Sequence, residues 1–202
     1  MKRSIIFICM ALICVSASFA QPKTGKGSKP HVATKEYEAI RKGDQFINIM
    51  GGPLFPMFTM TPNGLNTDTR MNIGGTLNIG YSTFLTKEFA LGGMVNFSFN
   101  STTGQNIFFF LPVYLQATYE FSISRIHIPV SLCAGGAFQT YNSFNYFSPA
   151  VKPEIGVFYQ YNSDWSFGID AGWTLLPQWY ADESKNRVGN FLSLTAGFRY
   201  HF

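Results

Sequence analysis

The sequence has few charged residues and, beyond its first twenty residues, no long hydrophobic run. Charged side chains make up 13% of the 202 residues, about half the share usual for a soluble domain. The aromatic content of 17% excludes a disordered chain, which would have few aromatics and high charge. Because no later run approaches ~20 apolar residues, a helical membrane protein is excluded too. The mean hydropathy of +0.05 therefore indicates a β-rich protein, either a soluble barrel or sandwich or a membrane barrel.

The first twenty residues have the pattern of a secretory signal peptide. Lys2 and Arg3 precede an apolar run, and small residues follow up to Ala20, which predicts a signal over residues 1–20 with cleavage after Ala20. The alternative is a lipoprotein signal acylated at Cys14. Ile13 disfavours it, because such a signal has a small residue at that position.

Cysteine is scarce once this signal is removed. Cys9 and Cys14 leave with it, and Cys133 alone remains. One cysteine cannot form an internal disulfide, so the exported protein is expected to fold without one.

The positive net charge belongs to the N-terminal part of the chain. Residues 21–43 hold six basic and two acidic residues, and their Lys, Gly, Pro and Ser content predicts a flexible basic arm. Contact of this arm with an anionic lipid or polymer is the alternative. Residues 44–202 hold seven basic and nine acidic residues, a net −2 against +4 for the whole chain. Nucleic acid is therefore not expected as a partner.

Alternation of apolar with small polar residues dominates residues 44–202, and its period of two is typical of β-strands. Eight strands are expected, at roughly 45–58, 71–82, 89–100, 111–121, 126–139, 151–162, 165–175 and 192–202. Short connectors (85–88, 122–124, 163–164) alternate with longer ones (61–69, 101–106, 142–148, 178–188). An even strand number with this alternation is the plan of an outer-membrane barrel.

The polar face distinguishes this barrel from a soluble, lipocalin-like one, which points its charged residues outward. Here that face is mostly Gly, Ser, Asn and Thr, which suits a crowded interior better than a water-exposed surface. The sequence therefore predicts an all-β, eight-stranded, antiparallel up-and-down transmembrane β-barrel at residues 44–202.

Aromatic residues are expected in two belts at the bilayer interfaces. Between the belts the outward side chains are mostly aliphatic. The belt at the short connectors includes Tyr81, Phe84, Phe89, Tyr119, Phe121, Tyr159, Tyr161, Trp165, Phe167, Phe198, Tyr200 and Phe202. The other includes Phe55, Phe58, Phe108, Phe109, Phe138, Trp173 and Trp179.

The last nine residues resemble the terminal β-signal of bacterial outer-membrane proteins. Phe198, Tyr200 and Phe202 alternate with other residues and end the chain on Phe. Strand number and size extend the resemblance to small eight-stranded barrels of the OmpA, OmpX and OmpW type. This resemblance implies residence in the outer membrane with both termini periplasmic. It also implies outer-membrane lipid and the outer-membrane assembly machinery as partners.

The inward-facing charged residues are the candidate functional residues. They form an expected interior polar network of Glu120, Arg125, Lys152, Glu154, Asp170, Arg199 and His201. Three carboxylates against three cations would be balanced, as a low-dielectric interior requires. Glu120 and Arg125 flank a tight turn and are expected to pair, with Arg199 and His201 at the same end. The network is expected to fill the interior, and a gated ion path is the alternative.

Inward glycines leave a second alternative open. They can serve curvature and close packing, or leave a narrow cavity lined partly by Met94, Tyr114 and Phe158. The OmpW-type resemblance would then imply a conduit for small hydrophobic solutes.

No catalytic, cofactor-binding or metal-binding residues are expected. The longer connectors contain no histidine that could activate a serine, and the sequence has no metal or phosphate motif. We therefore expect a non-enzymatic barrel with a structural or surface-interaction role, with a lipid-modifying enzyme as a remote alternative. The longer connectors are candidates for binding an extracellular ligand through exposed aromatics, for example Phe144, Tyr146, Phe147, Trp179 and Tyr180.

Overall fold

The computed structural model describes residues 39–104, 106–142, 144–180 and 182–202. The expected signal peptide, and residues 21–38 of the expected arm, lie outside the described residues. Within these ranges, no helix is long and apolar enough to cross a membrane.

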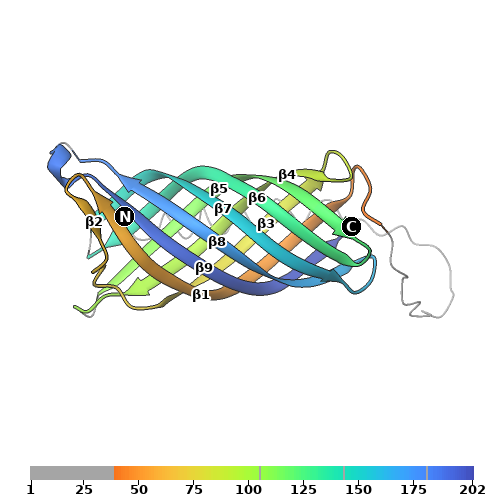
Figure 1. Ribbon diagram of the computed structural model, residues 1–202, viewed down its shortest axis with the longest axis horizontal. Helices are drawn as coiled ribbons and strands as arrows, with labels where there is room; N and C mark the ends of the chain where they lie inside the picture. Colours follow the sequence, from red (N-terminus) through yellow and green to blue (C-terminus); the bar gives the residue numbers. More distant parts are fainter. Residues whose placement is uncertain (1–38, 105, 143, 181) are drawn as a thin grey trace, which may run out of the picture. The chain divides into compact units, whose positions relative to one another are not determined.

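The described chain is almost entirely β-strand (Figure 1). Its strands are β1 Gln45–Thr61, β2 Gly64–Asn66, β3 Gly74–Phe84, β4 Phe89–Ser101, β5 Ile107–Ile123, β6 Ile126–Tyr141, β7 Phe144–Gln160, β8 Trp165–Gln178 and β9 Arg187–His201, and the 3₁₀ helix η2 spans Glu183–Lys185. Eight long strands pair antiparallel in sequence order, and β1 also pairs with β9, which closes the sheet. The three-residue β2 folds back on β1 alone. The eight-stranded antiparallel barrel predicted from the sequence is confirmed.

The two ends of the barrel differ. At one end, called the terminus end, lie the connectors 85–88, 124–125 and 161–164 and the last residue, Phe202. At the other, called the loop end, β1 continues into β2, and the connectors β2–β3, β4–β5, β6–β7 and β8–β9 follow. The expected loop over 142–148 is wrong, because β7 begins at Phe144 and pairs with β6 as far as Tyr141. The expected start of a strand at residue 71 is wrong too, since Met71 forms only an isolated bridge with Thr102.

The barrel is apolar outside and polar over much of its inside. Leu77, Leu115 and Ile169 point outward and expose 41%, 78% and 64% of their surface. Their strand neighbours Asn78 and Gln116 point inward and are buried. A soluble barrel would have the reverse arrangement, whereas this one suits a lipid environment.

The two aromatic belts lie where they were expected, with two exceptions. Tyr159 and Phe167 are exposed near the terminus end, and Phe138 is exposed near the loop end. Phe84 and Phe108, however, are buried inside the barrel. Phe84 is two residues from inward-facing Ser82, and Phe108 is two residues from inward-facing Phe110. Because alternate residues of a strand face the same side, both side chains point into the lumen.

One strand pair separates near the loop end. The β7–β8 ladder ends at Val151 opposite Leu175. In the same register Pro149 would stand opposite Pro177, and neither has an N–H to donate. Beyond the prolines, the side chain of Tyr146 joins β7 to the residue after β8, since its hydroxyl bonds the backbone of Trp179.

Inward glycines allow close approach of neighbouring strands. A Cβ at Gly135 would lie 1.9 Å from the carbonyl oxygen of Val113 and 2.9 Å from Cα of Tyr114. Gly93 points outward, and its nearest atom would be the carbonyl oxygen of Tyr114 at 3.6 Å, an ordinary contact. Only the first position therefore excludes a side chain.

We predict that Gly135→Ala lowers the free energy of unfolding by about 1–3 kcal/mol, because two backbones must move apart. The measurement is the urea midpoint of the fast-migrating folded band on unheated detergent gels. Gly93→Ala is the matched control and should leave the midpoint nearly unchanged. Equal midpoints for the two variants would contradict the packing described here.

Candidate functional site

The lumen near the terminus end contains a buried ion pair. Arg199 on β9 donates through Nη1 to Oε2 of Glu120 on β5 at 2.8 Å. Nδ1 of His127 on β6 lies 3.2 Å from Oε1 of Glu120, and Nε2 of the same ring lies 2.9 Å from Oε1 of Gln160 on β7. Four side chains from four strands therefore cross-link the wall through the lumen.

Arg199 is also held by aromatic rings. Its guanidinium carbon lies 3.8 Å from the ring centre of Phe158 and 4.8 Å from that of Phe46, a cation–π arrangement. His201 lies two residues further along β9, closer to the terminus end. Its Nε2 lies 2.8 Å from Oγ of Ser166. Arg199 and His201 thus lie at the same end as Glu120, as expected.

The expected pair of Glu120 with Arg125 is wrong. Glu120 stands opposite Pro129, and the β5–β6 ladder continues for three more pairs to Ile123 opposite Ile126. Arg125 is therefore carried beyond the rim into the turn, where it is exposed and its Nη1 lies 3.5 Å from the carbonyl oxygen of Tyr161. Arg199 takes the place that was predicted for Arg125.

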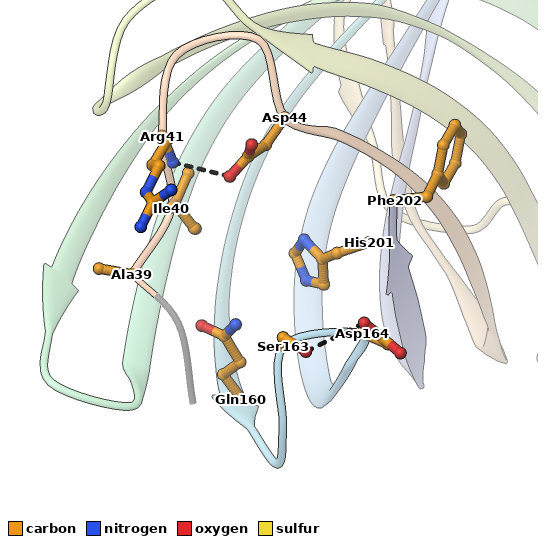
Figure 2. Close-up of a pocket in the computed structure, with 9 residues that line it drawn as sticks. All are labelled: Ala39, Ile40, Arg41, Asp44, Gln160, Ser163, Asp164, His201 and Phe202. Atoms are coloured by element: carbon orange, nitrogen blue, oxygen red, sulfur yellow. Dashed lines mark hydrogen bonds between the residues drawn. The ribbon is translucent and has the colours of Figure 1, made fainter. Parts of the chain in front are cut away.

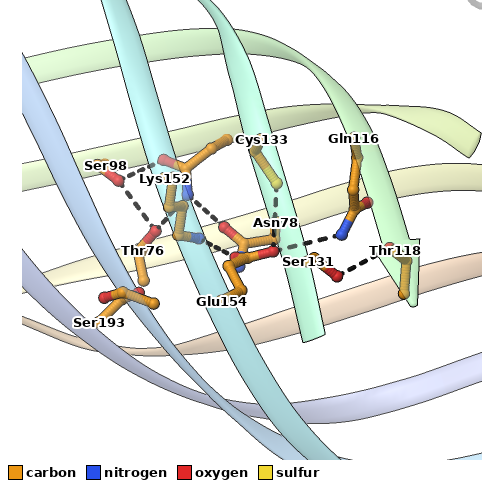
Figure 3. A network of polar contacts seen from close by, with 12 residues as sticks. Thr76, Asn78, Ser98, Gln116, Thr118, Ser131, Cys133, Lys152, Glu154 and Ser193 are labelled. Atoms are coloured by element: carbon orange, nitrogen blue, oxygen red, sulfur yellow. Dashed lines mark hydrogen bonds and ion pairs between the residues drawn. The ribbon is translucent and has the colours of Figure 1, made fainter. Parts of the chain in front are cut away.

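A second buried ion pair lies deeper in the barrel (Figure 3). Nζ of Lys152 lies 2.5 Å from Oε1 of Glu154, two positions along β7. The other carboxylate oxygen accepts hydrogen bonds from Nε2 of Gln116 at 3.3 Å and from Sγ of Cys133 at 3.5 Å. Lys152, Glu154 and also Asp170 on β8 face the lumen, as predicted.

Neutral polar side chains of β3 and β4 complete this level of the lumen. Nδ2 of Asn96 donates to Oγ1 of Thr76 at 2.9 Å and to Oδ1 of Asn78. Oγ of Ser98 donates to Oδ1 of Asn96 at 2.5 Å. These neutral residues were not among those predicted for the interior network, although they share the inward parity of their strands.

An apolar plug fills the lumen towards the loop end. Three of its members are in ring contact, with centroids 5.4 Å apart for Phe108 and Phe110, 5.1 Å for Phe110 and Phe191, and 6.0 Å for Phe108 and Phe191. The plug consists of Leu54, Met94, Phe108, Phe110, Tyr114, Cys133, Ala137, Ala150, Leu176 and Phe191. The expected polar interior is thus wrong in this part of the barrel. Parity with Tyr114 could have found Phe108 and Phe110.

Phe191 shares the inward parity of Ser193 and Thr195 on β9, but it lies before the expected strand 192–202 and was therefore not placed. Asn190 is the residue that departs from alternation. The β1–β9 register shifts between Pro56 and Phe58, and on the facing strand both Asn190 and Phe191 are buried. Such an irregularity resets which residues face inward. Met94, Tyr114 and Phe158, named as the lining of a cavity, are each buried by packing.

The loop end is held by a cluster of aromatic and amide side chains. The hydroxyl of Tyr146 donates to the carbonyl oxygen of Trp179 and accepts from its N–H, both at 2.8 Å. The rings of Tyr146 and Tyr180 stack at 5.8 Å. Arg187 donates through Nε to Oε1 of Gln178 at 2.5 Å and through Nη2 to the hydroxyl of Tyr180 at 3.1 Å.

The connector between β8 and β9 contains a capped turn. Oδ1 of Asp182 accepts hydrogen bonds from Oγ of Ser184 at 2.6 Å and from its N–H at 3.2 Å, and Nζ of Lys185 lies 3.2 Å from Oδ2. The bonds from Ser184 and then Lys185 hold the pKa of Asp182 below its ordinary value.

The terminus end carries a cavity of about 280 Å³ (Figure 2). Its wall includes Gln160 and His201 from the barrel, and the segment 39–44 forms the opposite side. The lining residues are Ala39, Ile40, Arg41, Asp44, Gln160, Ser163, Asp164, His201 and Phe202. In the part of the chain that the structure describes, no three His, Cys, Asp or Glu residues come together to hold a metal.

The fold and its filled interior define a transmembrane barrel of the outer-membrane type. Neisserial surface protein A (NspA) has this fold with a TM-score of 0.59 and 11% sequence identity, over 80% of this chain and 100% of that one. The outer-membrane protein OprG from Pseudomonas aeruginosa has a TM-score of 0.54 and 12% identity, over 83% of this chain and 99% of that one.

Sequence comparison identifies the family. A family model without a descriptive name matches residues 25–200. An uncharacterized protein of Treponema pallidum (strain Nichols) is 30% identical over an alignment of 211 positions, which covers 96% of this chain and 96% of that one. The chain belongs to the family of this treponemal protein.

We predict that Glu120→Ala lowers the free energy of unfolding by about 3–5 kcal/mol, because it leaves the buried charge of Arg199 without its partner. Combining it with Arg199→Met should restore part of this loss. The measurement is a double-mutant cycle of urea unfolding in lipid vesicles. Arg125→Met, in the exposed turn, is the control, and an effect as large as that of Glu120→Ala would contradict the assignment of Arg199 as the partner.

Proposed function

We propose that this chain is an integral outer-membrane barrel with a closed lumen and a non-enzymatic, structural or surface-interaction role. Its outward face supports insertion in a bilayer, because aliphatic residues lie between two belts of exposed aromatics. Outer-membrane lipid would then contact the outer wall of the barrel, and water would contact the barrel only at its two ends.

The apolar plug is the observation that carries the closed lumen. An eight-stranded barrel encloses a space just wide enough for side chains. Leu54, Phe110 and Leu176 reach this space from three strands, and each exposes only 1% of its surface. A solute moving along the axis would have to displace the packed rings of Phe108, Phe110 and Phe191. This packing favours closure over the conduit alternative.

The orientation in the membrane is part of the proposal. Short connectors at the terminus end support placing that end in the periplasm, together with both termini. The aromatic residues Phe198, Tyr200 and Phe202 of β9 would then serve as the signal for the outer-membrane assembly machinery.

The loop end would face outward and contact any extracellular ligand. Its longest described connectors are 67–73 and 179–186. Trp179 exposes 60% and Phe144 exposes 78% of its surface there, as residues that anchor a partner do. The histidines that the structure describes, His127 and His201, lie at the terminus end, which supports a non-enzymatic role for the loop end.

We predict that the refolded protein shows no stepwise conductance in planar lipid bilayers, because the plug blocks the axis. The variant Phe110→Ala/Phe191→Ala removes two of the three rings in contact and should open measurable conductance. The same pair of recordings with Phe109→Ala, whose side chain faces lipid, is the control and should stay closed. Clear conductance or solute flux in the unaltered protein would overturn the closed-lumen proposal and favour a conduit.

A further inference from the structure

Between the plug and the Glu120–Arg199 pair, several buried polar atoms have no protein partner. They include Oδ1 of Asp170 and Oγ1 of Thr195, which stand directly opposite each other on β8 and β9. Thr195 exposes 3% of its surface. Nζ of Lys152 contacts Glu154, and it has further N–H groups that donate to no protein atom. Leaving such atoms unbonded in a low-dielectric interior is costly.

Asp170 has room beside it for a small ligand. Its strand neighbours Ile169 and Ala171 face lipid, so Asp170 faces the lumen, yet it is only half-buried. Its carboxylate reaches over the glycine of the next strand, since a Cβ at Gly156 would lie 3.1 Å from Oδ2 of Asp170. The accessible part of Asp170 is therefore turned towards the inside of the barrel.

The hydrogen-bonding properties of these atoms indicate which small molecule would bind there. Asp170 accepts hydrogen bonds, Lys152 donates them, and Thr195 can do either. Among the described residues, no three His, Cys, Asp or Glu side chains come together to hold a metal cation. A molecule that both donates and accepts and needs two to four polar partners is water.

We propose that Asp170, Thr195 and Lys152 hold a cluster of ordered water molecules, so that the barrel encloses a hydrated chamber between the plug and the Glu120–Arg199 pair. The apolar plug separates this chamber from the loop end. Towards the terminus end, the buried side chains of Arg199, Glu120 and His127 bound it, and their contacts continue to Gln160.

The variant Thr195→Val tests whether water is bonded to this hydroxyl, because the two cases shift the unfolding equilibrium in opposite directions. If the hydroxyl bonds water, its loss shifts the unfolding equilibrium towards the unfolded state by about 2- to 12-fold, the equivalent of one net hydrogen bond. If the hydroxyl is dry and unbonded, the valine shifts the equilibrium towards the folded state. An unchanged equilibrium or a shift towards the folded state would overturn the proposal.

A direct observation of the water uses nuclear magnetic resonance of the refolded barrel in lipid nanodiscs. We expect cross-peaks between water and the methyl group of Thr195, and none to the methyl group of Ala150 in the plug. Thr118→Val is the matched control, because it removes a hydroxyl bonded to Ser131 at 2.8 Å and should leave the Thr195 cross-peak in place. Absence of that cross-peak in the unaltered protein would refute the hydrated chamber.

Discussion

Closure of the wall by the β1–β9 pair is the constraint on which the rest of the structure depends. Every backbone polar group facing lipid must be bonded within the wall, because hydrocarbon supplies no partner. The twelve register pairs between β1 and β9 leave no free sheet edge over the body of the barrel. Closure with eight long strands in turn fixes a lumen that side chains must fill.

The filling of that lumen is divided by depth. Near the terminus end, Arg199 donates to Glu120 across it, and His127 lies against the same carboxylate. Glu154 and Lys152 form a second charged level, and the rings of Phe108, Phe110 and Phe191 form the plug beyond it. Glu120 and Glu154 thus each meet a cation, and the volume towards the loop end is closed by apolar packing, which needs no partner.

Much of this could be predicted from the sequence, because alternation fixes which face a strand residue takes. It placed Lys152, Glu154, Asp170 and Arg199 inside and gave the strand number. It failed where strand ends decide. Arg125 was misplaced because the length of the β5–β6 hairpin is set by pairing across strands. Phe191 was missed because β9 begins at Arg187, before residue 192, where the strand was expected to start. Side-chain partners across the lumen, such as Glu120 and Arg199, are 79 residues apart and have no local signature.

The wall of the barrel is weakest between β7 and β8, beside the two facing prolines. Above Val151 and Leu175 the two strands share no ladder. The hairpin tops on either side are therefore joined by side chains, Tyr146 with Trp179 and Gln178 with Gln139, rather than by a row of amide bonds. Local opening takes the route with the fewest bonds to break. Thermal fluctuation of the barrel is therefore expected to separate the wall at this line before any other, and motion at the loop end should be a hinge motion of two hairpins rather than a uniform swelling.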